Sequence, residues 1–188
     1  MQDFKTVIFQ DPRTVFSFND IAMLFGVSQH LRLRQQLNYY VKKGLLLNLR
    51  RGIYAKTEYN PEEIAGNIFK PSYISLQYVL QKEGVIFQYD SQITSVSYLS
   101  RTINIDGNSF CYKKIKNSVL LDTTGILRGR DGCNIATAER AFLDILYLNK
   151  EFYFDNPSKL DRNKLEKLIL LYDSKSLVEK VERVFNGI

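Results

Sequence analysis

The sequence predicts an α+β protein built from two parts, residues 1–58 and residues 59–188. In the first part, two short helical patterns are followed by a basic hairpin. In the second part, alternating strand patterns end in turn signals, and strongly periodic helical segments close the chain. The junction near residues 57–61 is short, so we expect the two parts to touch.

Composition bounds the class of protein before any motif is considered. Of the 188 residues, 45% are hydrophobic and 24% are charged, which is ordinary for a globular chain and argues against collagen, coiled coils and disorder. No run approaches about 18 apolar residues and no secretory leader is visible, so we expect no membrane span. Cys111 and Cys133 are too few to staple a secreted fold, and we expect a cytoplasmic protein with reduced thiols.

The formal net charge of +6 is spread unevenly along the chain. Residues 1–60 hold nine of the 26 basic side chains and four of the 20 acidic ones, a balance of +5, which leaves +1 for residues 61–188. No acid occurs between Asp20 and Glu58. Such a stretch is typical of a surface that binds a polyanion, above all nucleic acid, although a chance run on a solvated face would give the same pattern.

The first helix is predicted after Ser17, because Ser17 and Asp20 have the spacing of a capping box. Phe16 and Ile21 occupy the two positions of a hydrophobic staple. Gly26 is expected to end this helix, since glycine accepts the left-handed conformation common after a helix C-terminus.

A second helix is predicted from about residue 28 to residue 43, with Ser28 as its N-cap and Gly44 after its end. The helical spacing of Leu33, Leu37, Tyr40 and Val41 gives it one apolar stripe. Side chains that suit base edges or phosphates lie on the opposite face, on its flank and near the start of the helix: Gln29, His30, Arg32, Arg34, Gln35, Asn38, Tyr39 and Lys42. A merely solvated amphipathic helix has the same polar face, and His30, which lacks partner ligands, is interpreted first as a surface residue.

The segment after this helix predicts a β-hairpin with strands at 45–47 and 53–55 and a turn at 48–52. Arg50 and Arg51 then lie near the hairpin tip. Two helices joined by a glycine-containing turn, the second of them basic, and then a basic hairpin together predict a winged helix-turn-helix. In that fold the second helix enters the major groove of DNA, and the hairpin contacts the backbone or the minor groove.

The second part predicts, in order along the chain, helices, a meandering antiparallel sheet and further helices. Asn60 and Pro61 open a helix, and Asp106-Gly107 is a hairpin signal. The predicted helices are 61–69, 74–82, 137–148, 160–172 and 175–186, and the predicted strands are 93–98, 102–105, 110–115, 124–127 and 134–136.

Catalytic patterns are scarce in this part of the chain. The glycines from Gly125 to Gly132 lack the ending of a phosphate loop and are interpreted as a turn. Arg140 and Asp144 are interpreted as an ion pair on a helix face beside the core. The two cysteines lack a histidine base. We therefore expect no enzyme, no catalytic residue, no metal site and no cofactor.

Four segments, in the same order along the chain, resemble the AbiEi family of antitoxins from type IV toxin–antitoxin systems. They are KKGLLLNLRRGIYAK, PSYISLQYVLQKEGVI, ITSVS followed by FCYKKI, and IATAERAFLDILYL. The chain departs mildly from the family pattern at two places. Tyr78-Val79 stands where the family usually has a small residue before its leucine, and Arg140 stands where lysine is usual. The resemblance implies a transcriptional regulator that binds inverted repeats in its own promoter. It also implies an antitoxin that counters, directly or indirectly, a nucleotidyltransferase-like toxin encoded beside it in a phage-defence setting.

The residues themselves support only the first of these two roles. We expect Arg34, Lys42, Lys43, Arg50 and Arg51 to hold DNA phosphates, and Gln29, His30, Arg32, Gln35 and Asn38 to read bases, with Ser28 at the start of the helix. The main alternative is a non-enzymatic interaction module whose basic face binds an acidic protein. An enzyme in the second part is a third hypothesis, and the lack of a nucleophile–base pair counts against it.

Overall fold

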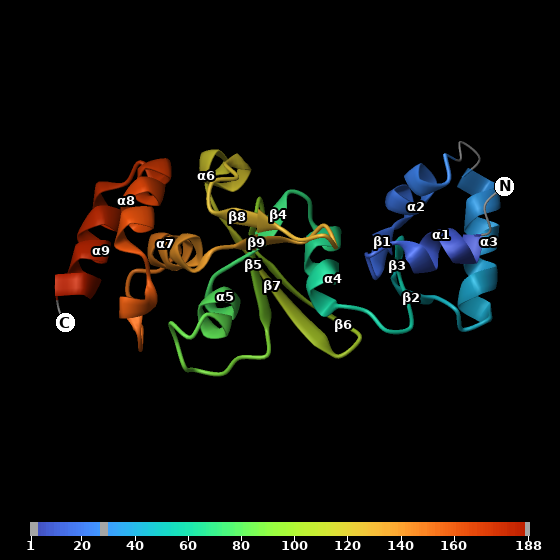
Figure 1. The fold of residues 1–188 in the computed structure, drawn as a ribbon, viewed down its shortest axis with the longest axis horizontal. Coiled ribbons are helices and arrows are strands. Elements are labelled where there is room, and N and C mark those ends of the chain that lie inside the picture. Colours follow the sequence, from blue (N-terminus) through green and yellow to red (C-terminus); the bar gives the residue numbers. More distant parts are fainter. Residues whose placement is uncertain (1–3, 27–29, 187–188) are drawn as a thin grey trace.

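The chain forms two units, each built on its own sheet, along one elongated body (Figure 1). The computed structural model describes residues 4–26 and 30–186, so the predicted residues Ser28 and Gln29 lie outside the described residues. Helix α3 lies at one end of the body and helices α8 and α9 lie at the other. Within the described residues no helix has the length and apolarity needed to cross a bilayer.

The N-terminal unit (residues 4–55) combines three helices with a three-stranded antiparallel sheet of order β1-β3-β2. Its elements are α1 (Phe4–Gln10), β1 (Val15–Ser17), α2 (Phe18–Leu24), α3 (His30–Lys42), β2 (Leu47–Arg50) and β3 (Ile53–Ala55). The first helix and the first strand have no clear signal in the sequence, because seven and three residues are too short to show a period.

The predicted capping box at the start of α2 is confirmed. The Asp20 N–H donates to Ser17 Oγ at 3.1 Å, and the Ser17 N–H donates to the Asp20 carboxylate at 2.8 Å. The predicted apolar stripe of α3 is also confirmed, since Leu33, Leu37 and Tyr40 are buried.

The hairpin differs from its predicted boundaries. Asn48 and Arg50 belong to strand β2, with an irregularity in pairing between them, and only Arg51 and Gly52 form the turn. Gly52 has a φ of +80°, a conformation that glycine adopts at little cost, and this shortens the turn from the predicted five residues. Arg50 therefore lies at the end of a strand and Arg51 at the tip.

The second unit (residues 61–186) places helices around a six-stranded sheet of order β6-β7-β5-β4-β9-β8. Its helices are α4 (Pro61–Ile68), α5 (Gln77–Lys82), α6 (Asn117–Leu121), α7 (Ala138–Leu148), α8 (Arg162–Ile169) and α9 (Lys175–Asn186), with short 3-10 turns at Pro157–Lys159 and Leu170–Tyr172. Its strands are β4 (Ser72–Ile74), β5 (Ile93–Ser97), β6 (Arg101–Ile105), β7 (Asn108–Lys114), β8 (Ile126–Arg128) and β9 (Asn134–Ala136).

The α+β class, the antiparallel pairing and the C-terminal helices agree with prediction, but the larger sheet is mixed. Strands β5 and β7 are parallel, as are β4 and β9, so the strands do not simply meander. Strand β7 lies between β5 and β6 because Phe110 and Tyr112 are apolar enough for a central strand, whereas Arg101, Thr102 and Asn104 of β6 suit an exposed edge. Residues 72–74, partly predicted as helix, form the central strand β4.

Helix α7 carries the predicted ion pair of Arg140 and Asp144, but the pair is fully buried in a polar network and does not lie on a helix face beside the core. Arg140 and Asp144 are both 0% exposed, with Arg140 Nε 3.7 Å from Asp144 Oδ1. The carboxylate accepts from the hydroxyls of Ser75 at 2.7 Å, Tyr172 at 2.7 Å and Tyr73 at 3.2 Å. Burial raises the pKa of both tyrosines, so their hydroxyls stay protonated and act as donors.

The Arg140 guanidinium ties α7 to the backbone around it. It donates to the carbonyl oxygens of Thr124 at 2.9 Å and Val119 at 2.6 Å. The rings of Tyr73 and Tyr172 lie about it, with their centroids 5.5 and 5.4 Å from the guanidinium carbon. These contacts compensate a buried charge that would otherwise be costly.

The two units meet at Glu63 of α4, which is only 2% exposed. Its carboxylate accepts from the Thr14 N–H at 2.7 Å, the Thr14 hydroxyl at 2.6 Å and the Val15 N–H at 2.8 Å. The Asn60 N–H in turn donates to Thr14 Oγ1 at 2.8 Å. Val15, Ile53 and Ala55 also contribute to the main core of the second unit, so the expected contact between the parts is an extensive one.

Replacing Glu63 with alanine is expected to lower the free energy of unfolding by about 2–4 kcal/mol, because buried donors of Thr14 and Val15 lose their acceptor. Urea denaturation followed by circular dichroism measures the change. The matched control is Glu83→Ala, an exposed carboxylate, for which we expect less than about 0.5 kcal/mol. Equal values for the two variants would contradict the role assigned to Glu63.

Replacing Asp144 with asparagine keeps the volume of the side chain but removes the charge that faces Arg140. We expect a loss of about 3–5 kcal/mol in the free energy of unfolding, since the guanidinium is then buried without a counter-charge. The same denaturation experiment with the exposed Glu166→Gln serves as the control. A loss below about 1 kcal/mol would show that the tyrosines and carbonyl oxygens alone compensate Arg140.

Candidate nucleic-acid interface

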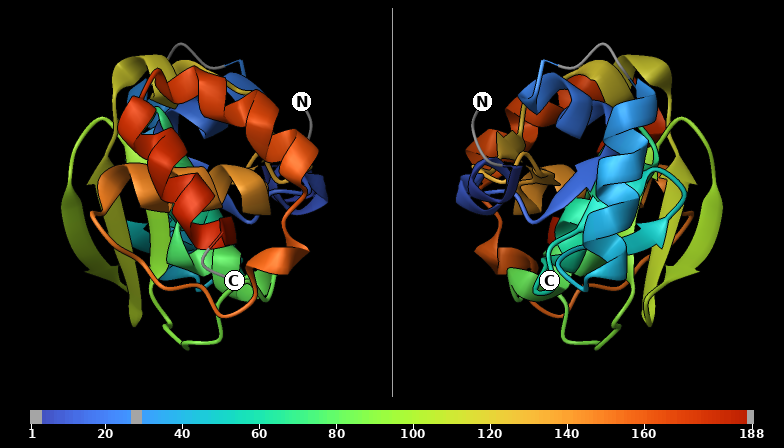
Figure 2. Two further views of the ribbon diagram at one scale, coloured as in Figure 1. Left: turned by 90° about the vertical axis from the view of Figure 1, so that its left-hand side faces the viewer. Right: turned by 90° about the vertical axis from the view of Figure 1, so that its right-hand side faces the viewer.

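Helix α3 lies across the outer end of the N-terminal unit, on the side away from the second unit (Figure 1; Figure 2, right). Its buried stripe faces the unit. The side chains of Arg32, Gln35, Asn38 and Lys42 are exposed on the opposite side. We call these four residues the outer face of α3. The structure therefore brings together four of the residues predicted from sequence to contact nucleic acid.

An aromatic stack holds α3 in this position. The Phe4 ring of α1 lies 4.8 Å from the Phe25 ring, just after α2, and 4.4 Å from the Tyr40 ring of α3, with only 9° between the planes in each pair. Phe4 and Tyr40 are buried. Because the Phe4 ring contacts residues of both other helices, packing on the inner side of α3 fixes its orientation. The outer face of α3 takes no part in this packing.

His30 and Arg34 lie on the flank of α3 and contact the start of α2. The His30 ring is 5.5 Å from the Phe18 ring, and the Arg34 guanidinium carbon is 5.3 Å from the same ring. Both residues remain exposed. Their contact with Phe18 gives them a packing role that the sequence did not indicate, and His30 lies apart from the outer face.

The hairpin places Arg50 and Arg51 on the surface, but its base belongs to the contact between the units. Leu47 and Leu49 of β2 pack against the core of the second unit. Burial raises the pKa of Tyr112 in β7, and the nearby charge of Arg50 partly offsets that rise. Arg50 therefore lies close to the second unit, whereas Arg51 is exposed in the turn.

The cations of this region lack anionic partners. Within residues 4–26 and 30–186, no ion pair involves any of the six basic side chains predicted to face nucleic acid. They are Arg32, Arg34, Lys42, Lys43, Arg50 and Arg51. Unpaired positive charge on one end of a protein creates a potential that attracts polyanions.

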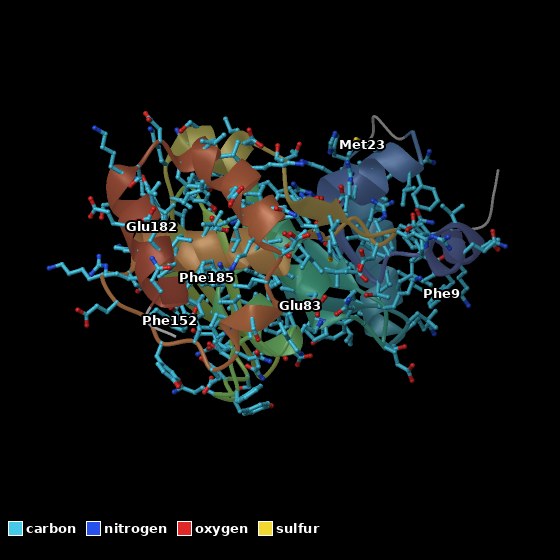
Figure 3. The ribbon with its side chains drawn as sticks, turned by 60° about the vertical axis from the view of Figure 1, so that its left-hand side comes forward. Phe9, Met23, Glu83, Phe152, Glu182 and Phe185 are labelled. Carbon is cyan, nitrogen blue, oxygen red and sulfur yellow. The ribbon has the colours of Figure 1, made fainter. Side chains whose placement is uncertain are left out.

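Two exposed hydrophobic side chains, Leu31 and Met23, were not predicted as contacts, whereas Tyr39 was predicted on the polar face of α3. Leu31 is 74% exposed, Tyr39 is 55% exposed, and Met23 of α2 is 73% exposed and projects from the surface (Figure 3). The Lys43 ammonium lies 5.8 Å from the centre of the Tyr39 ring. The sequence did contain a signal for Leu31, because it is an apolar residue of the helix that does not belong to the buried stripe.

Among the described residues no group of three or more histidine, cysteine or carboxylate side chains is placed to hold a metal ion. Cys111 and Cys133 are buried and unpaired by disulfide. Burial, followed by the charge of Asp131, raises the pKa of Cys133, which keeps this thiol in its unreactive protonated form.

Comparison with known proteins found neither a protein-family model that matches the chain nor a curated protein similar to it.

Proposed function

We propose that the protein is a DNA-binding transcriptional regulator whose N-terminal unit is a winged helix-turn-helix. The observation that carries this proposal is the exposed basic surface of α3 and the hairpin, whose cations have no ion-pair partner in the described chain. The element order helix–strand–helix–helix–strand–strand and the sheet order β1-β3-β2 are those of winged helices, and they support the proposal.

The chemistry of the outer face of α3 suits the major groove. The helix has 13 residues and is therefore about 20 Å long, enough to cross a groove about 12 Å wide. Arg32 suits the two acceptors of guanine, and Gln35 and Asn38 suit the acceptor and donor of adenine. Lys42 and Lys43, at the end of the helix, and Arg51, in the hairpin turn, supply charge for phosphates.

Duplex DNA selected from a random pool, or taken from upstream of the coding sequence, is expected to bind the protein with a sequence preference and a strong dependence on salt. The double variant Arg50→Ala/Arg51→Ala should reduce the slope of log K against log salt by about one to two units, because up to two phosphate contacts are lost. Fluorescence anisotropy at several salt concentrations measures both quantities, and Lys150→Ala is the control, an exposed lysine of the second unit.

An unchanged salt slope would contradict the hairpin assignment. If no duplex shifts the anisotropy at physiological salt, whereas an acidic protein binds the same face, the interaction-module alternative is correct and the regulator proposal is wrong.

For the second unit we propose a protein partner, which the resemblance to AbiEi antitoxins makes a nucleotidyltransferase-like toxin. Three exposed aromatic side chains on two neighbouring loops support this proposal: Phe87 is 68%, Tyr89 81% and Tyr153 79% exposed. The loops are joined, since the Phe87 N–H donates to the Asp155 carboxylate at 2.8 Å. Exposed aromatic residues on tethered loops are typical anchors of protein interfaces.

Co-expression with the product of the neighbouring reading frame tests this second role. If that product is a nucleotidyltransferase-like toxin, the wild-type chain should restore growth, and the triple variant Phe87→Ser/Tyr89→Ser/Tyr153→Ser should restore it less well, because aromatic anchors carry much of the binding energy. The control is Leu170→Ser, which replaces an exposed residue of the 3-10 turn Leu170–Tyr172. Full rescue by the triple variant would contradict the role of these loops.

A further inference from the structure

A cleft of about 830 Å³ lies between the two units, and both of them contribute walls. Arg13 and Asp20 come from the N-terminal unit, and the β8–β9 hairpin and the Lys70–Tyr73 segment come from the second unit. The volume is within the range of about 300–1,000 Å³ that small-molecule sites occupy. Nothing in the proposed DNA contacts of α3 uses this cleft.

The acidic side chains of the cleft have structural partners. Glu63 accepts from Thr14 and Val15, Asp20 caps α2, and the Asp131 carboxylate accepts from the Cys133 N–H at 3.1 Å. Their charges are therefore partly satisfied by backbone donors.

Two cations of the cleft have no such partner. Arg128 and Arg130 are exposed and form no ion pair within residues 4–26 and 30–186. Lys70 is mostly exposed, with its ammonium 3.9 Å from the Asp20 carboxylate, whereas Arg13 is held by Asp11 at 2.7 Å. The cations available to a ligand are thus Arg128 and Arg130. Lys70 lies near the Asp20 carboxylate, which already accepts a hydrogen bond from the Ser17 N–H.

The hairpin that carries the two arginines has a tightly bonded tip. The Gly129 N–H donates to the Cys133 carbonyl oxygen at 2.9 Å, and the Gly132 N–H donates to the Gly129 carbonyl oxygen at 3.0 Å. A Cβ at Gly129 would meet the Asp131 carboxylate, so a larger residue there would displace that side chain. A tip constrained in this way presents its arginines at a lower entropic cost than a loose loop would.

Neutral polar side chains complete the lining. Ser72 belongs to it, but the Ser72 hydroxyl is buried and offers no accessible surface to a ligand in the cleft. Asn67 and Asn134 add amide groups to the same lining.

We propose that this cleft binds a small ligand that carries a phosphate group together with hydroxyl or amino groups. The phosphate contacts Arg128 and Arg130, which match its geometry, and the hydroxyl or amino groups of the ligand face the carboxylates and amides of the lining. The same mixed lining disfavours a nucleic-acid strand, because carboxylates such as Asp122 and Asp131 repel a continuous polyanion. The proposal stands independently of DNA binding by α3.

Isothermal titration calorimetry of the full chain with AMP tests the proposal, with inorganic phosphate and a DNA duplex as comparison probes. We expect AMP to bind, and to bind more tightly than phosphate. Arg128→Ala and Arg130→Ala should each raise the Kd for AMP about tenfold, through loss of a charge-assisted contact. Lys150→Ala, outside the cleft, should leave it unchanged, and Arg128→Lys should recover part of the loss. Bound AMP should also raise the Tm of the wild-type chain but not that of the double variant Arg128→Ala/Arg130→Ala.

Three results would overturn the proposal. The first is the absence of any binding heat at AMP concentrations up to about 5 mM, because a Kd above that value would be too weak for a specific site. The second is AMP binding that both arginine variants retain in full. The third is a combined result: AMP does not bind, and the binding of a DNA duplex depends less on salt in the Arg128 and Arg130 variants than in the wild-type chain. That result would make the β8–β9 hairpin part of a nucleic-acid surface. None of these results bears on α3, whose contacts are tested by the hairpin variant Arg50→Ala/Arg51→Ala.

Discussion

The buried carboxylate of Glu63 is the interaction on which the relation between the two units depends. It lies on the first helix of the second unit and accepts from the backbone at the start of β1. Strand β1 pairs with β3, and β3 pairs with β2, so the whole N-terminal sheet is placed relative to α4 through this strand. A single charged residue can do this because three donors satisfy it in the absence of water.

The second unit is organised around another charge that water does not reach. Arg140 lies in the first turn of α7 and Asp144 one turn further on, and their partners come from β4 and the residue after it, from the segments around α6 and from the turn before α9. Replacing such a pair with apolar residues is often neutral for stability, so its value here lies in specifying which elements meet. The network gives β4, α6 and α7 one relative arrangement, and this arrangement forms part of the cleft wall.

The surfaces proposed to act are separated by this rigid interior. Helix α3, which carries the outer face, lies at one end of the body (Figure 1). The exposed aromatic residues Phe87 and Tyr153 belong to the second unit, and the cleft is lined by residues of both units. Because Val15 and Ile53 share a core with the second unit, a ligand in the cleft contacts elements that position both units. DNA bound at α3 and a ligand bound at Arg128 would therefore both contact units that share one packed core.

The local signals in the sequence were sufficient for several caps and turns, although they missed α1 and β1 and made the turn of the N-terminal hairpin too long. Ser17 and Asp20 predicted their cap, Gly44 the end of α3, and Asp106-Gly107 a turn, because each is decided by backbone chemistry within one turn of chain. The uneven charge likewise predicted which end of the protein is basic. Only the tertiary structure decided which strands are neighbours, that Arg140 is buried rather than on a surface, and that Arg128 and Arg130 line a cleft opposite Arg13. These depend on residues far apart in the chain, where packing overrides local preference.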